Sequence, residues 1–186
     1  MNRALLVIDV QNEYFSGKLP VTHPPNSLDN ILRAMEAAAA NGVAVAVIRH
    51  AAKAASSPVF KKGSPEWELH PAVGKLHRDV LIEKNWPDSF TETNLQEWLH
   101  GRDIDTLTVC GYMTQMCCDT TARRAFHLGY GVELLADATG TLALRNEAGA
   151  VTAEELHRAI LVTQARFSKV MNTDDWISRI QADLNP

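Results

Sequence analysis

The chain has 186 residues, 46% of them hydrophobic, and a formal net charge of −4 at pH 7. This length is typical of one domain, so we expect a single domain over residues 1–186 with enough apolar side chains for a full core. The acidic balance provides no basic field for a phosphate backbone, which argues against nucleic acid as a partner.

The first residues run directly into an apolar strand pattern, so the sequence predicts neither a signal peptide nor a membrane helix, and no membrane partner. Three cysteines, two of them adjacent, do not make a disulfide framework. We therefore expect a cytoplasmic protein with free thiols.

Strand-like apolar runs alternate with helical patterns along the chain. The predicted strands are residues 3–9, 43–48, 80–83, 106–110, 132–136 and 168–171. The predicted helices are residues 27–41, 91–100, 114–128, 152–166 and a last one from residue 173. Residues 51–75 are rich in small residues and prolines, which predicts a long functional loop with one short helix.

Six strands alternating with helices predict an α/β fold of three α/β/α layers around a doubly wound, mainly parallel, Rossmann-like sheet. A dinucleotide site would need a glycine-rich turn after the first strand, but Asp9 is followed there by Val-Gln-Asn-Glu-Tyr-Phe. The sequence also lacks a Walker-type Gly-Lys-Ser/Thr loop. No cofactor is therefore expected.

Three reactive side chains each follow a predicted strand: Asp9, Lys84 and Cys117. In a parallel sheet the ligand crevice lies beyond the carboxyl ends of the strands, so these residues can meet in one pocket. An acid, an ammonium and a thiol together suggest a thiol nucleophile that needs no histidine, and hence acyl transfer or hydrolysis.

The chemistry expected of the three groups follows from their charges. The Lys84 ammonium and a helix N-terminus would favour the thiolate of Cys117 by lowering its pKa. Asp9 would accept the thiol proton and return it to the leaving amine. Backbone N–H groups of the turn before Cys117 could stabilise the charge that develops on the attacked carbonyl oxygen.

Four groups of residues in chain order, covering nearly the whole chain, resemble one known family. They are Leu6 to Asn12, Lys84 with Asp88 to Leu95, Val109 to Ala122, and Leu128 to Val132 with Asp137-Ala138. With these motifs the chain resembles the isochorismatase-like cysteine hydrolases, which include nicotinamidases, carbamoylsarcosine-type amidohydrolases and streptothricin hydrolases.

The resemblance implies a catalytic triad of Asp9, Lys84 and Cys117, and an oxyanion hole formed by the backbone N–H groups of Met113 and Cys117. It also implies a cis peptide bond between Tyr112 and Met113, and it selects Cys117 rather than Cys118 as the nucleophile. Members of the family act on small molecules and are often homo-oligomers in which a neighbouring subunit completes the site.

Each of these residues also has a structural interpretation. Asp9 could cap a loop, and Lys84 alone would usually be a solvated surface lysine. Cys117 and Cys118 could both be small core residues; successive helical residues point ~100° apart, so at most one can face the crevice well. Cys110, within an apolar strand, is expected in the core.

Some nicotinamidases of this family bind a metal through an Asp-x-His pair and a further histidine. The corresponding residues here are Ile48-Arg49-His50, without that aspartate, and the next histidine is His70. We therefore expect no metal site, and the departure also argues against nicotinamide as the substrate.

Four aromatic residues lie in loops near the three reactive positions: Phe15, Phe60, Trp86 and Tyr112. They could form an apolar wall for the substrate, or they could pack locally. The long loop of residues 51–75 is expected near the crevice.

The leading hypothesis is a hydrolase of a small amide-like C–N bond that forms a thioester and releases a carboxylic acid and an amine or ammonia. True isochorismatases of the family cleave a vinyl ether and have a small residue in place of Cys117, so the thiol argues against that reaction. The remaining alternative is a non-catalytic or redox protein using Cys117 and Cys118. Adjacent cysteines rarely form a good disulfide, and such a pair would need neither Asp9 nor Lys84.

Overall fold

The computed structural model describes residues 1–184. Its strands are β1 (Arg3–Ile8), β2 (Ala44–His50), β3 (Val80–Lys84), β4 (Thr106–Tyr112), β5 (Gly131–Gly140), β6 (Leu144–Asn146), β7 (Gly149–Val151) and β8 (Lys169–Met171). Its helices are α1 (Ser27–Ala40), α2 (Pro71–Lys75), α3 (Leu95–His100), α4 (Asp119–His127), α5 (Ala153–Gln164) and α6 (Thr173–Leu184), with short turns η1 (Asn12–Tyr14) and η2 (Thr114–Cys118). No helix among these residues is both long and apolar enough to cross a membrane.

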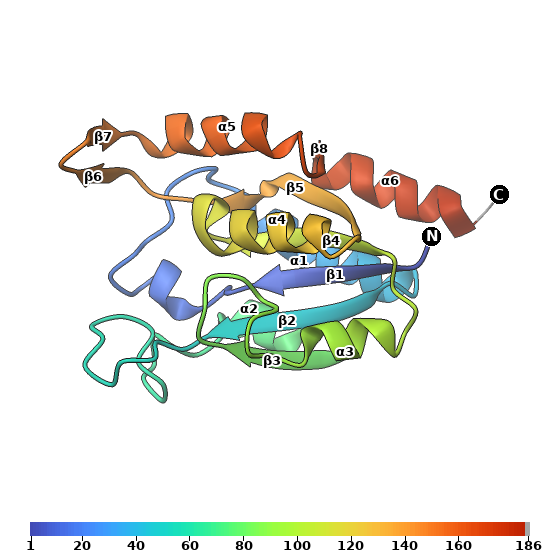
Figure 1. Ribbon diagram of the computed structural model, residues 1–186, viewed down its shortest axis with the longest axis horizontal. Helices are drawn as coiled ribbons and strands as arrows, with labels where there is room; N and C mark the ends of the chain where they lie inside the picture. Colours follow the sequence, from blue (N-terminus) through green and yellow to red (C-terminus); the bar gives the residue numbers. More distant parts are fainter. Residues whose placement is uncertain (185–186) are drawn as a thin grey trace.

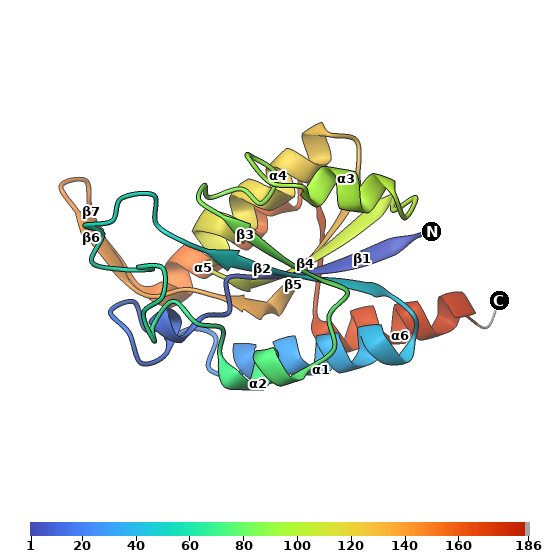
Figure 2. The same cartoon turned by 90° about the horizontal axis from the view of Figure 1, so that it is seen from below.

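Six strands form one sheet in the order β3-β2-β1-β4-β5-β8, and every neighbouring pair is parallel. Helices α3 and α4 cover one face of this sheet, and α1, α2 and α6 cover the other (Figures 1 and 2). The predicted three-layer, doubly wound α/β fold is therefore confirmed.

Both faces of β1 are buried, which explains its uninterrupted apolar sequence. Leu5 and Val7 contribute to the core beneath α1 and α6, whereas Leu6 and Ile8 contribute to the core beneath α3 and α4. Alternate side chains of β1 thus pack against the helices on opposite faces of the sheet. Polar groups can gather where the strands end.

Some predicted boundaries shift for local reasons. Helix α5 begins at a capping box in which Thr152 and Glu155 bond each other, as the sequence predicts. The helix predicted from residue 91 begins only at Leu95. The reason is that Asp88 Oδ1 accepts the N–H groups of Phe90 and Thr91 at 2.9 Å each, which holds this segment in a turn. The antiparallel hairpin of β6 and β7 was not predicted.

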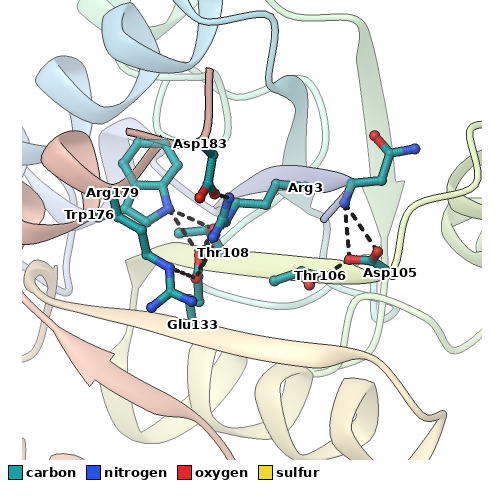
Figure 3. Close-up of polar contacts among 9 residues, drawn as sticks. Arg3, Asp105, Thr106, Thr108, Glu133, Trp176, Arg179 and Asp183 are labelled. Carbon is teal, nitrogen blue, oxygen red and sulfur yellow. Dashed lines mark hydrogen bonds and ion pairs between the residues drawn. The ribbon is translucent and has the colours of Figure 1, made fainter. Parts of the chain in front are cut away.

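A buried polar network joins α6 to the amino-terminal part of the sheet (Figure 3). Glu133 of β5 lies at its centre and accepts hydrogen bonds from Arg3 Nε at 3.1 Å, Thr108 Oγ1 at 2.8 Å and Trp176 Nε1 at 3.1 Å. Arg3 is also paired with Asp183 of α6. Since Trp176 is fully buried, the network satisfies its indole N–H and fixes α6 against the sheet.

Replacing Glu133 by alanine is expected to lower the free energy of unfolding by about 3–5 kcal/mol, because the buried Arg3 guanidinium keeps only the half-exposed Asp183 and the buried Thr108 and Trp176 lose a shared acceptor. Chemical denaturation measures this loss, with Glu36→Ala on the exposed side of α1 as the control. Equal, small effects of the two substitutions would contradict the role given to Glu133.

Candidate active site

The structure brings Asp9, Lys84 and Cys117 together beyond the carboxyl ends of β1, β3 and β4. Asp9 directly follows β1, Lys84 is the last residue of β3, and Cys117 lies in the π-helical turn η2 after β4. Lys84 Nζ is 2.8 Å from Asp9 Oδ2 and donates a hydrogen bond to Cys117 Sγ at 3.2 Å. The ammonium thus bridges the carboxylate and the sulfur.

Backbone geometry sets this arrangement. Gly111 pairs with Ile8 in the sheet and has φ +112°, and a Cβ atom there would lie 2.0 Å from the carbonyl oxygen of Ile8. Only glycine permits so close an approach of β4 to β1. Asp9 itself has φ 52°, in the left-handed region, and its N–H donates to the carbonyl of Ile48 at 3.0 Å.

All three side chains are buried: the residues are 0%, 1% and 7% exposed for Asp9, Lys84 and Cys117. The Lys84 ammonium also donates a hydrogen bond to the carbonyl oxygen of Trp86 at 3.1 Å. Burial lowers the pKa of Lys84, but the Asp9 carboxylate and the Cys117 sulfur raise it by more, so that the net direction is upward and Lys84 stays charged.

The Asp9 carboxylate keeps acceptor capacity. Although Lys84 Nζ lies beside Oδ2, neither carboxylate oxygen accepts a hydrogen bond of good geometry within residues 1–184. The Lys84 contact is therefore best described as an ion pair. Buried carboxylate lone pairs that no donor occupies are suited to receive a proton.

The pKa of the Cys117 thiol is raised, first by burial and then by the Asp9 carboxylate, while Lys84 opposes the shift without reversing it. Lys84 thus lowers the pKa of Cys117 as expected, but the net shift is upward. Burial disfavours the charged sulfur, and the carboxylate beside it disfavours a second negative charge. The raised pKa favours the thiol over the thiolate, and a thiol needs a base before it can act as a nucleophile.

The turn that carries Cys117 begins at a cis peptide bond between Tyr112 and Met113. The Met113 carbonyl accepts the N–H groups of Met116 at 3.0 Å and Cys118 at 3.3 Å, which closes the turn. Cys117 points toward Lys84, whereas Cys118 is fully buried in the core beneath α3 and α4. Cys110 is also fully buried, as expected.

Three of the four aromatic residues predicted to line the site gather around Tyr14. Its ring packs edge-on against Phe60 at 5.2 Å and Tyr112 at 5.6 Å, and Tyr112 contacts Phe15 at 5.8 Å. The Tyr112 hydroxyl lies 3.0 Å from Ser27 Oγ, away from the reactive groups and toward α1. Trp86 is not among these ring contacts; it is 40% exposed and lies under the ammonium of Lys53.

Two residues near the reactive groups were not assigned to the active site from the sequence: Tyr14, and His50, which was considered only as a metal ligand. Tyr14 is buried, and its pKa is raised by burial and by the nearby charges of Cys117 and Asp9. His50 is kept neutral by burial, which lowers its pKa, and its Nδ1 has no hydrogen-bond partner in the described part of the chain. The position of Tyr14 five residues after Asp9 is the one feature of the sequence that could have placed it near the reactive groups. Residues 1–184 contain no group of three or more His, Cys, Asp or Glu side chains arranged to hold a metal ion.

Comparison with solved structures gives close matches over almost the whole chain. A structure of an isochorismatase-type protein from Burkholderia xenovorans has a TM-score of 0.94 and 49% sequence identity, covering 97% of this chain and 88% of that one. A cysteine hydrolase from Pseudomonas syringae has a TM-score of 0.91 and 30% identity, covering 97% of this chain and 93% of the other.

Sequence relatives agree with these structures. An isochorismatase family protein of Bacillus subtilis is 34% identical over 162 residues, which is 87% of this chain and 90% of the relative. Nicotinamidase 3 of Arabidopsis thaliana is 33% identical over 174 residues, 87% of this chain and 80% of the relative. The family model described as the isochorismatase domain matches residues 3–175. The chain therefore belongs to the isochorismatase family of hydrolases.

Proposed function

We propose that the protein is a cofactor-independent hydrolase that cleaves an amide-like C–N bond of a small molecule through a thioester on Cys117. The observation that carries this proposal is the contact of one buried ammonium, Lys84, with both the Asp9 carboxylate and the Cys117 sulfur. The similarity to a nicotinamidase and to a cysteine hydrolase supports the same class of reaction.

In the first half of the reaction the Cys117 thiol gives its proton to Asp9 as the sulfur attacks the substrate carbonyl carbon. The carbonyl oxygen gains negative charge, which the backbone N–H groups of Met113 and Cys117 are proposed to stabilise. Asp9 then transfers the proton to the nitrogen, the C–N bond breaks, and an amine or ammonia leaves. The acyl group remains on the sulfur as a thioester.

In the second half a water molecule gives a proton to Asp9 and attacks the thioester carbonyl. The C–S bond breaks, the carboxylic acid leaves, and Asp9 returns the proton to the sulfur. Lys84 stays protonated throughout. Its positive charge compensates the negative charge of the Asp9 carboxylate before proton transfer and the negative charge of the sulfur as the thiolate forms. The buried site therefore never holds an uncompensated negative charge.

The alternative role as a redox cysteine pair has little support from the geometry. Cys118 is fully buried and adjacent to Cys117, and bridging adjacent cysteines strains the peptide between them. A redox pair also gives no reason to bury an ion pair beside the sulfur. Of the functions considered, hydrolysis is the one that uses all three groups.

Turnover of a panel of small amides, followed as released acid and ammonia or amine, tests the proposal. Asp9→Asn is expected to lower turnover about 10²–10⁴-fold because no base accepts the thiol proton, and Cys117→Ser is expected to abolish it. Since Asp9→Asn leaves Lys84 buried without its partner, circular dichroism must show that the variant is folded, and Cys117→Ser provides the nearly isosteric second test. Asp174→Asn, at a side chain that is 77% exposed, is the control. Turnover of either active-site variant at the wild-type rate would refute the mechanism.

The raised pKa of Cys117 predicts how its alkylation depends on pH. Below its pKa, the thiolate fraction rises about tenfold for each pH unit, so alkylation of Cys117 by iodoacetamide is expected to keep rising between pH 7 and pH 9. Peptide mass spectrometry gives the rate, and Cys117→Ala gives the background from the fully buried Cys110 and Cys118. A rate that is already constant at pH 7 would show a preformed thiolate and contradict the need for Asp9 as a base.

A further inference from the structure

A buried histidine of α5 contacts the turn that carries Cys117. His157 Nδ1 lies 2.9 Å from Thr114 Oγ1, and His157 Nε2 lies 3.0 Å from the carbonyl oxygen of Ala136. Thr114 is fully buried and is the first residue of η2, one residue beyond the cis peptide bond between Tyr112 and Met113. One imidazole thus joins the turn to β5 from a helix that lies outside the sheet.

The chemistry of the partners fixes the tautomer of His157. A carbonyl oxygen can only accept, so the proton of the neutral ring is on Nε2, and Nδ1 must accept a hydrogen bond from the Thr114 hydroxyl. Because Thr114 lies between Met113 and Cys117, a hydroxyl held in one direction also holds the backbone that joins these two residues.

We propose that His157 is a positioning residue: through Thr114 it fixes the turn that presents the Cys117 sulfur to Asp9 and aligns the backbone N–H groups of Met113 and Cys117. This inference rests on the proposed function of Cys117 as the nucleophile. Small displacements of a nucleophile from its productive geometry lower reaction rates steeply, so a hydrogen bond at the base of the turn is a sensitive point.

With the Thr114 hydroxyl as the donor, the bond requires neutral His157. Protonation would turn Nδ1 into a donor, and the Thr114 hydroxyl, fully buried, would lose its acceptor. Burial and the neighbouring His23, whose ring lies 5.3 Å away, both lower the pKa of His157.

The other charged groups around His157 are engaged elsewhere. Asp137, next to Ala136, accepts from the N–H and hydroxyl of Thr173 at 2.8 Å each. Glu154 and Arg158 of α5 pair with each other at 3.8 Å on the exposed side. Burial therefore lowers the pKa of His157 most, His23 lowers it further, and both favour the neutral ring.

Alkylation of Cys117 by iodoacetamide tests the inference without knowledge of the substrate. His157→Phe removes both hydrogen bonds and is expected to slow alkylation at pH 8 about tenfold or more. The Thr114→Val variant is expected to behave similarly, and the Thr114→Val/His157→Phe double variant to be no slower than the slower single variant, because both act through one contact. Leu161→Ala, one turn further along α5 and packed on the core, is the control for a general loss of stability.

His157→Gln separates positioning from structural support, because glutamine has an acceptor and a donor but does not titrate. This variant is expected to react at pH 8 faster than His157→Phe. The ratio of the wild-type rate to the His157→Gln rate is expected to be constant from pH 9 to pH 7 and to fall only at pH values below the ordinary histidine pKa of about 6.5, since only the wild type can protonate at this position. Once a substrate is known, His157→Phe should lower kcat and leave KM within about twofold.

Two outcomes overturn the inference. One is a His157→Phe alkylation rate equal to that of Leu161→Ala, and the other is a rate ratio to His157→Gln that does not change with pH. If Cys117 is alkylated and these substitutions do not change the rate, only the role of His157 is refuted. If Cys117 of the wild type is alkylated at no pH, the proposed function is refuted, and the role of His157 is refuted as well.

Discussion

The ion pair between Lys84 and Asp9 is the interaction on which the candidate site depends. Each charge is fully buried, and each would be strongly destabilising there without the other. The two residues belong to the ends of β3 and β1, so the pair forms only in the parallel register that places these strand ends on one edge of the sheet. Cys117 reaches the same point because Gly111 lets β4 approach β1 closely.

Burial and the same ion pair together act on the pKa of Cys117. Burial raises this pKa most, the Asp9 carboxylate raises it further, and Lys84 lowers it, so the net direction favours the protonated sulfur. In the proposed mechanism, proton transfer and nucleophilic attack are linked through Asp9, which distinguishes this site from one with a preformed thiolate. The carboxylate lone pairs left without donors are consistent with this function.

Much of this architecture could be predicted from the sequence. The fully buried strands are continuous apolar runs, and the reactive residues follow them directly, so the three-layer fold and the meeting of Asp9, Lys84 and Cys117 were accessible. The β6–β7 hairpin was not, since its residues are mostly exposed and show no apolar alternation. The direction of the Cys117 pKa and the contact between Thr114 and His157, 43 residues apart, depend on three-dimensional packing that no local pattern encodes.

The most direct test of the account is to quench the wild-type protein with acid during turnover of a small amide and to measure its intact mass. The account predicts an adduct equal to the acyl part of the substrate, located on Cys117 by peptide mapping and lost in the presence of hydroxylamine. Product formation without such an adduct, or an adduct on another residue, would contradict the central claim that Cys117 forms a thioester.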